Sequence, residues 1–197
     1  VDIQGLPVIT IPTTAGTGSE VTKNSVITVP ERKVKVSMRG NGMPARIAIV
    51  DPELTYSLPT DITATTGMDA LTQVIEAYMS NNSNLISDAY ALEGINRGAG
   101  SILKAFLNGK DEEARENMAM TALFSGIALS QSGLGAVHGF AGVIGGMTDA
   151  PHGAICACIL PAVLRANFEV IHKGNNNRDA YLKFTRLSQI LTGVPSS

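Results

Sequence analysis

The feature that most constrains the fold is a change of hydrophobic period near Asp51-Pro52. Before this point, short runs rich in β-branched residues are separated by Gly, Pro and Asn, which is typical of strands and turns. After it, apolar residues recur every three to four positions, as they do on the buried face of an amphipathic helix. The sequence therefore predicts a mainly helical protein with a β-rich N-terminal piece.

Turn and cap signals between the apolar runs divide the chain into elements. Asn81-Asn82-Ser83 offers a turn and a cap, and Pro151 stands at a favourable first helical position. Strands are expected over residues 8–11, 25–29, 34–38 and 48–50. Helices are expected over residues 67–79, 84–108, 112–131, 133–145, 151–168 and 178–192.

Charge and hydropathy narrow the classes of partner. The chain has 15 Lys and Arg against 17 Asp and Glu, so no strong field is available to recruit nucleic acid or an anionic membrane. Charged residues make up only 16% of the chain, compared with roughly a quarter in typical soluble domains. We therefore expect much of its surface to be buried against other segments or subunits. No run of about 18 consecutive apolar residues is present, so a soluble protein is predicted.

The two cysteines indicate the compartment. Cys156 and Cys158 are separated by a single residue inside an apolar run, a spacing that no disulfide framework uses. A reducing, cytoplasmic location is therefore expected.

Polar residues recur at helical spacing in the segment from Gly67 to Tyr78. Asp69, Gln73 and Glu76 fall on one helix face. A buried, unpaired carboxylate there would cost roughly several kcal/mol, so it would require a cation, a hydrogen-bond donor or solvent. The alternative is a solvated polar stripe of an amphipathic helix.

Two histidines lie among small and apolar residues. His138 follows Gly133-Leu134-Gly135, and His152 stands at a loop-to-helix junction. Taken singly, they could be a satisfied core histidine and a capping group. Together with Asp69 they make a chemically sensible divalent-metal site with open positions for water or substrate. His172 has a more polar context and is expected to be exposed.

Three segments carry a resemblance to a known family. Pro12 to Thr22, Gly67 to Thr72, and Gly133 to Gly139 with Pro151-His152-Gly153 closely match the iron-containing (group III) alcohol dehydrogenases, in the family's order. The chain resembles a central fragment of such an enzyme. The resemblance implies a β-rich remnant of an α/β nucleotide-binding domain over residues 1–55. It also implies a dehydroquinate synthase-like all-helical metal-binding domain over residues 56–197, incomplete at its C-terminus.

The resemblance also assigns residues to a dinucleotide. Thr13, Thr14 and Thr22 fall on family positions that contact NAD or NADP, and Lys35 falls on a basic position near the cofactor phosphates and ribose. Hydroxyls, backbone donors and a cation can all hold a pyrophosphate. Without the family, a Thr- and Gly-rich loop would be read as a plain turn.

The family's metal ligands, one Asp and three His, map onto Asp69, Gln73, His138 and His152. Gln73 is a departure and a doubtful ligand, because a neutral amide binds iron or zinc more weakly than imidazole does. Gly142 stands where the family has a further His near the substrate. Related glycerol dehydrogenases manage with one Asp and two His, so a three-ligand site for iron or zinc is expected.

The implied function is hydride transfer between NAD or NADP and a small alcohol or aldehyde, with room for substrate beside Gly139, Ala141 and Gly142. One alternative is a divergent, non-catalytic domain of the same fold with a weakened metal site. Another is a metal-dependent lyase such as dehydroquinate synthase, which the matched segments disfavour. Unpaired sheet edges in the β-rich piece lead us to expect a homo-oligomer, and the isolated chain is expected to be inactive.

Overall fold

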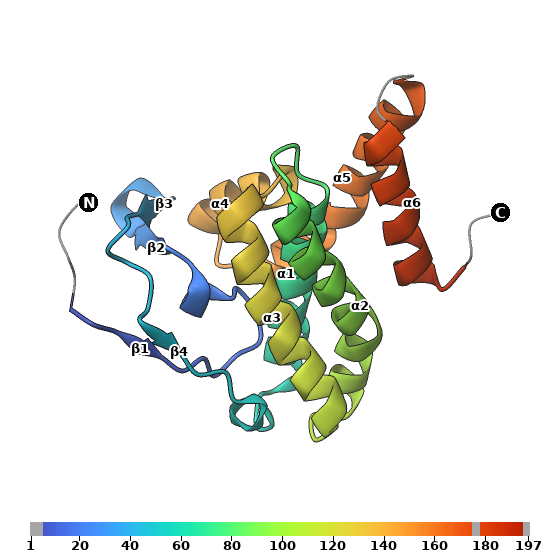
Figure 1. Ribbon diagram of the computed structural model, residues 1–197. Coiled ribbons are helices and arrows are strands. Elements are labelled where there is room, and N and C mark those ends of the chain that lie inside the picture. Colours follow the sequence, from blue (N-terminus) through green and yellow to red (C-terminus); the bar gives the residue numbers. More distant parts are fainter. Residues whose placement is uncertain (1–5, 175–177, 195–197) are drawn as a thin grey trace.

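The computed structural model describes residues 6–174 and 178–194, and helices dominate this part of the chain (Figure 1). The predicted mainly helical class is confirmed. Each expected helix is found, with bounds that differ from the prediction by seven residues at the start of α1, by five at the end of α5 and by at most three elsewhere. The helices are α1 (Thr60–Tyr78), α2 (Leu85–Leu107), α3 (Glu112–Ser132), α4 (Ala136–Met147), α5 (His152–Lys173) and α6 (Arg178–Thr192).

The largest difference from prediction lies at the start of α1, which begins at Thr60 instead of residue 67. Threonines have low helix propensity, so the sequence TDITATT gave little helical signal. In the structure, Thr65 and Thr66 donate hydroxyl hydrogen bonds to the carbonyls of Asp61 and Ile62 one turn earlier. Thr63 is buried and accepts a hydrogen bond from Arg115. Tertiary contacts thus override local propensity.

Between residue 6 and the start of α1, the structure contains four short strands, as predicted. β2 (Asn24–Val29) and β3 (Val34–Arg39) form an antiparallel hairpin around the 3₁₀ turn η2 (Pro30–Arg32). β1 (Ile9–Thr10) and β4 (Ile47–Ala48) pair in parallel. Both two-stranded sheets have open edges, and the apolar side chains of Val26, Ile27, Val36 and Met38 on the hairpin are exposed.

The hairpin lies beside the C-terminal half of α4 (Figure 1). A Cβ atom at Gly146 would lie 2.9 Å from both the Lys33 carbonyl oxygen and the Val34 Cα, so the glycine permits this contact. Two further 3₁₀ turns, η1 (Ser19–Val21) and η3 (Pro52–Thr55), pack against α3. These contacts place the β-rich piece against the helices, while its assignment as a separate domain remains a prediction.

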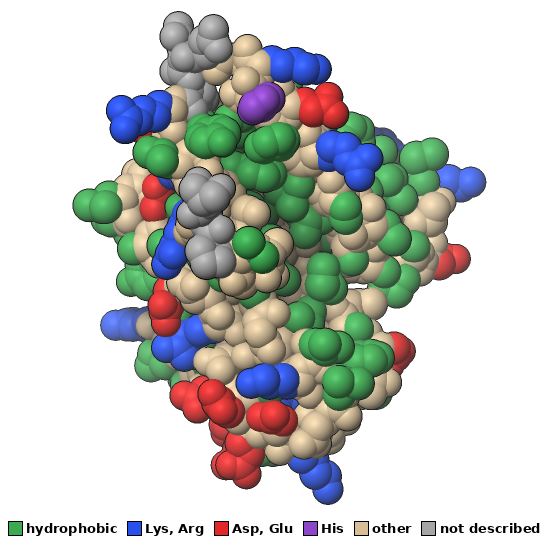
Figure 2. Space-filling view, turned by 90° about the vertical axis from the view of Figure 1, so that its right-hand side faces the viewer, with side chains coloured by type: hydrophobic (Ala, Val, Ile, Leu, Met, Phe, Trp, Pro, Cys, Tyr) green, Lys and Arg blue, Asp and Glu red, His purple; other side chains and the backbone are tan. Residues whose placement is uncertain are grey.

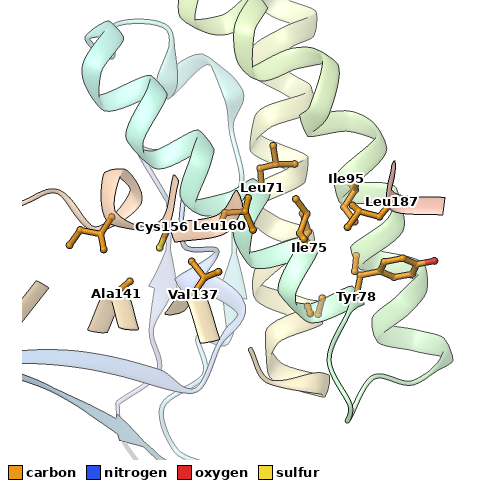
Figure 3. Close-up of a cluster of buried hydrophobic side chains, with 14 residues drawn as sticks. Leu71, Ile75, Tyr78, Ile95, Val137, Ala141, Cys156, Leu160 and Leu187 are labelled. Carbon is orange, nitrogen blue, oxygen red and sulfur yellow. The ribbon is translucent and has the colours of Figure 1, made fainter. Parts of the chain in front are cut away.

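The main hydrophobic core lies around α1, which contacts α2, α3, α4 and α5 (Figure 3). Leu71, Val74 and Ile75 of α1 pack there against Ile95 of α2 and Leu187 of α6. The buried members of this core are Leu71, Val74, Ile75, Ala77, Tyr78, Ala91, Ile95, Ala128, Val137, Ala141, Ile155, Cys156, Leu160 and Leu187.

Lys183 fastens α6 to the connection between α1 and α2. Its ammonium group pairs with Asp88 at 2.6 Å and donates to the Tyr78 carbonyl at 3.0 Å and the Ser83 hydroxyl at 2.7 Å. It also lies 4.9 Å from the centroid of the Tyr78 ring. The Lys183 ammonium group thus provides a hydrogen-bond donor for polar groups within this connection and on either side of it, which would otherwise be unpaired beside the core.

The surface around α5 and α6 carries many exposed apolar side chains, and Figure 2 shows green patches on this side of the molecule. Val170, Tyr181, Leu182 and Leu191 belong to this group. By length and composition, α5 is also the one described helix that could cross a membrane by itself. That property is weak evidence for a membrane span, because core helices of soluble proteins share it.

Helix packing predicts opposite effects for two glycines of α2. A Cβ at Gly98 would lie 2.9 Å from Thr121 Cγ2, and the Thr121 hydroxyl is held by the Gly94 and Asn117 carbonyls. We expect Gly98→Ala to lower the free energy of unfolding by roughly 1 kcal/mol or more through overpacking. Gly100→Ala, where a Cβ meets nothing within 4 Å, should raise it by about 0.5–1 kcal/mol. Urea denaturation measures both, and equal stabilisation by the two variants would contradict this packing.

Candidate metal centre

The polar face predicted on α1 is buried. Asp69, Gln73 and Glu76 are 4%, 3% and 6% exposed, so the alternative of a solvated stripe is wrong. Buried carboxylates require donors or cations. Both acids find their partners on α4 and α5.

Asp69 meets both predicted histidines. Its Oδ1 atom lies 3.2 Å from His138 Nε2 on α4 and 3.8 Å from His152 Nε2 at the start of α5. The structure thus brings together the Asp69, His138 and His152 side chains that the sequence singled out, from positions up to 83 residues apart in the chain. The His152 side chain is 34% exposed, so the cluster opens toward solvent on that side.

Gly153 explains how α5 approaches α1 closely enough to form the cluster. A Cβ at this position would lie 1.8 Å from the Thr65 carbonyl oxygen and 3.2 Å from Asp69 Cβ. No rearrangement of a flexible side chain could relieve a clash with backbone. The glycine after His152 is therefore a requirement of the site and not only of a helix start.

Glu76 positions His138. Its carboxylate accepts a hydrogen bond from the Val137 amide at 2.7 Å and from the His138 amide at 3.1 Å, and it lies 2.6 Å from His138 Nδ1. Glu76 thereby caps the N-terminus of α4, where Gly135 has no side chain to do so. A Cβ at Gly135 would lie 2.8 Å from Glu76 Oε1, so the glycine leaves space for the carboxylate.

The sequence placed Glu76 on the correct helix face but gave it no role. The available signal was its spacing of seven residues from Asp69, which is two helical turns. Residues at that spacing point the same way, so one helix can present a metal-facing carboxylate and a second carboxylate behind a histidine ligand. Such carboxylate–histidine pairs are a common feature of metal sites.

Cys156 also belongs to the cluster and was not predicted. One ligand atom each from Asp69, His138, His152 and Cys156 lie within 4.8 Å of one another. The signal that could have found it is the four-residue spacing between His152 and Cys156 on α5, which puts both side chains on one face.

The two histidines have opposite pKa shifts. Burial lowers the pKa of His138, but hydrogen bonds with Asp69, Cys156 and Glu76 outweigh it and raise the pKa to about 11. Burial lowers the pKa of His152. The negative charge of Asp69 opposes this shift, whereas the positive charges of His138 and Lys35 add to it, and the pKa remains lowered. Negative charge is thus concentrated around His138. Either a proton or a divalent cation would neutralise this charge.

Gln73 links α1 to the N-terminal loop and to α3. Its Nε2 atom donates to the Thr17 carbonyl and to the Ser125 hydroxyl, both at 2.8 Å. The loop itself is held close because Gly18 adopts φ +59° and a Cβ there would lie 2.2 Å from the Ala122 carbonyl oxygen. The amide nitrogen of Gln73 is therefore occupied with structural contacts, and a ligand role for this residue stays a prediction.

The threonines predicted to contact a dinucleotide lie in two settings. Thr13 and Thr14 are exposed on a bend between β1 and η1. Thr22 is buried, and its hydroxyl donates to the Ser19 carbonyl at 3.2 Å. The first two present free surface to a ligand, whereas Thr22 stabilises its own turn. Their roles toward NAD or NADP remain predictions.

Lys35 lies on β3 next to Gly145 of α4, where a Cβ would be 3.1 Å from the lysine Nζ. It lines a pocket between the hairpin and the connection from α4 to α5, together with Lys33 and Asp149. The positive charge of Lys35 contributes to the lowered pKa of His152, so this pocket is close enough to the cluster to influence its electrostatics. A basic pocket beside the cluster is compatible with the predicted contact to cofactor phosphates.

The small residues expected to leave room for substrate divide into two groups. A Cβ at Gly139 or Gly142 would meet nothing within 4 Å, so both border open space. Ala141 instead is fully buried in the main core, and the expectation that it lines the substrate space is wrong. The reason is helical phase, because Ala141 lies one turn from the buried Val137 and packs with it in the main core, whereas Gly142 lies one turn from His138. His172 is exposed, as predicted.

The donor set fits a divalent transition metal. One carboxylate oxygen and two imidazole nitrogens suit iron or zinc, and a carboxylate behind one imidazole fixes its orientation. The negative charge buried around His138 gives a cation a further reason to bind. Asp69, His138 and His152 are thus the residues that would hold it.

Family models match both parts of the chain. Residues 63–196 match the model described as Fe-containing alcohol dehydrogenase family, C-terminal, and residues 2–52 match the model described as iron-containing alcohol dehydrogenase. The first match alone covers more than half of the chain.

Curated relatives agree. Alcohol dehydrogenase 4 of Saccharomyces cerevisiae is 42% identical over 164 residues, covering 83% of this chain and 43% of the yeast protein. The 1,3-propanediol dehydrogenase of Klebsiella pneumoniae is 43% identical over 162 residues, covering 82% of this chain and 42% of that protein. The chain thus spans less than half the length of these relatives.

Solved structures share the fold. A crystal structure of 1,3-propanediol oxidoreductase superposes with a TM-score of 0.83 at 36% identity, covering 98% of this chain and 55% of that one. Sulfoacetaldehyde reductase of Bifidobacterium kashiwanohense, solved in complex with NAD⁺, gives a TM-score of 0.80 at 33% identity and covers 95% and 52% of the two chains. Sequence models, relatives and fold agree that this chain belongs to the iron-containing alcohol dehydrogenase family.

Proposed function

We propose that this chain supplies the metal-binding part of an NAD- or NADP-dependent alcohol dehydrogenase or aldehyde reductase, acting on a small alcohol or aldehyde. The observation that carries the proposal is the convergence of Asp69, His138 and His152 from three helices, with Glu76 behind His138. The relatives' names, alcohol dehydrogenase 4 and 1,3-propanediol dehydrogenase, support the substrate class.

When bound, a divalent metal supplies Lewis-acid polarisation of the substrate oxygen, and the nicotinamide donates or accepts the hydride. The residues of this chain would bind the metal ion and orient its ligands. Asp69, His138 and His152 would bind the ion. Glu76 would hold a proton on His138 Nδ1, because its Oε2 lies 2.6 Å from that atom, and it so directs Nε2 toward Asp69 and the ion.

Open space beside the centre would accommodate the substrate. Gly139 follows His138 directly, and Gly142 lies one helical turn further along α4. Neither position would place a Cβ against another atom, so the α4 surface there can be approached closely. The exposed Thr13 and Thr14 and the half-buried Lys35 are candidates to hold the dinucleotide.

The setting proposed for the protein is the cytoplasm, in a homo-oligomer. Cys156 and Cys158 are both free thiols, which suits a reducing compartment. The open edges of the β2–β3 hairpin and the exposed apolar residues of α5 and α6 would be covered by further protein in an assembly.

Turnover tests the activity. The complete polypeptide that carries these residues should oxidise NADH or NADPH in the presence of short aldehydes. A chelator should abolish the reaction and added zinc or iron(II) should restore it, because the site would polarise the carbonyl only when a cation is bound. Full activity in the metal-stripped protein would overturn the proposal, and conversion of substrate without change in the nicotinamide would point to lyase chemistry.

Asp69→Asn tests the metal site independently of turnover. Removal of the one carboxylate charge that faces both histidines should weaken zinc binding by at least about tenfold, as measured by calorimetry, since loss of even outer-shell partners costs about 10- to 100-fold. Asp61→Asn is the matched control, because Asp61 lies on the same helix but is exposed. Equal affinities of the two variants would exclude Asp69 as a ligand.

Glu76→Gln tests the positioning of His138. Glutamine keeps the size of the side chain, but its amide cannot accept hydrogen bonds from both the α4 backbone and His138. We expect zinc affinity to fall by about 10- to 100-fold while the helical circular dichroism is retained. Glu93→Gln, which removes an exposed partner of Arg97, should leave zinc affinity unchanged.

A further inference from the structure

Cys156 has a chemistry that the function proposed above does not use. It is a free thiol on α5, and its side chain is fully buried. Figure 3 shows its sulfur at the margin of the main core, near Val137 and Leu160. A buried cysteine in such a place would ordinarily be a small apolar filler. Its polar neighbours argue against that reading.

The sulfur faces three metal-binding groups at once. Cys156 Sγ lies 3.8 Å from Asp69 Oδ1, 3.8 Å from His152 Nε2 and 3.9 Å from His138 Nε2. The same Oδ1 atom lies 3.2 Å and 3.8 Å from the two imidazole nitrogens. One oxygen, two nitrogens and one sulfur thus form the four corners of a compact group.

These separations match the edges of a tetrahedral site. Ligand atoms about 2.0 to 2.3 Å from one zinc ion, at tetrahedral angles, lie roughly 3.3 to 3.6 Å from one another. The five separations that involve Asp69 or Cys156 run from 3.2 to 3.9 Å, and all four atoms lie within 4.8 Å of one another, so an inward shift of the side chains would bring them onto one ion.

Gln73 leaves the centre one imidazole short of the ligand set that the family resemblance implies. The family's ligand set, carried over by sequence, has an imidazole at this position, whereas the Gln73 amide nitrogen is bound to Thr17 and Ser125. Cys156 follows His152 by one helical turn, so α5 presents two donors to the centre. The same number of donors is then available with a different composition.

We propose that the Cys156 thiolate is the fourth protein ligand of this centre and that it shifts the metal preference from iron toward zinc. The proposal rests on the metal site of the proposed function. On binding, the Sγ–H bond breaks, its proton passes to solvent, and a sulfur–metal bond forms. Thiolate is a softer ligand than imidazole or carboxylate and favours zinc over iron(II) in a mononuclear site.

Cobalt(II) is the probe for the sulfur bond. The wild-type chain loaded with cobalt should show a near-ultraviolet thiolate-to-cobalt charge-transfer band and strong visible bands of a tetrahedral ion. Cys156→Ser and Cys156→Ala should lose the charge-transfer band. Cys158→Ser is the matched control and should keep it, because Cys158 is exposed two residues further along the same helix.

Zinc affinity and selectivity give a second measurement. Cys156→Ser should bind zinc at least about tenfold more weakly than wild type, since loss of even outer-shell partners costs about 10- to 100-fold. Its preference for zinc over iron(II), in anaerobic competition, should fall by a comparable factor. Unchanged affinity and unchanged preference would overturn the proposal.

X-ray absorption of the zinc-loaded wild-type chain requires no variant that has to fold. One sulfur neighbour at about 2.3 Å supports the proposal, and a first shell of only nitrogen and oxygen overturns it. Failure of this inference alone would appear as metal binding that depends on Asp69 but not on Cys156. Absence of cobalt and zinc binding in the wild-type chain would overturn the proposed metal function together with it.

Discussion

The buried carboxylate of Glu76 is the interaction on which the rest of the site depends. It is 6% exposed, and it finds its hydrogen bonds in the first turn of α4 and in the ring of His138. A charge buried on α1 would be costly without these donors, and α4 would begin with unsatisfied amides without the charge. The Glu76 carboxylate and the first turn of α4 therefore stabilise one another. Their hydrogen bonds hold the His138 ring next to Asp69.

Three glycines make these contacts possible by bringing backbones together. Gly153 lets α5 touch the Thr65 carbonyl, Gly135 leaves space for Glu76, and Gly18 lets the N-terminal loop pack on α3. Packing at this closeness tolerates no added methyl group. The segments that resemble the family are thus the places where two elements cross, and their glycines have a steric reason beyond any turn.

The centre differs from the family's expected ligand set in a physically coherent way. Gln73 has become part of the scaffold through its bonds to Thr17 and Ser125, while Cys156 faces Asp69 and both histidines. A change from imidazole to thiolate would retain a full set of donors but alter the ion that they prefer. Membership of an iron-named family therefore does not by itself decide the metal.

The sequence alone determined the mainly helical class, most element bounds, and Asp69, His138 and His152 as ligand candidates, because hydrophobic period, cap residues and local motifs are properties of neighbouring residues. It misplaced the start of α1, assigned Ala141 to the substrate space, gave Glu76 no role and missed Cys156. Tertiary structure decided these points. Thr63, in the part of α1 that the sequence missed, accepts a hydrogen bond from Arg115 of α3, and Cys156 reaches the cluster because α5 packs closely on α1 at Gly153. Which side chains converge depends on contacts between residues far apart in the chain, and a single sequence does not record those distances.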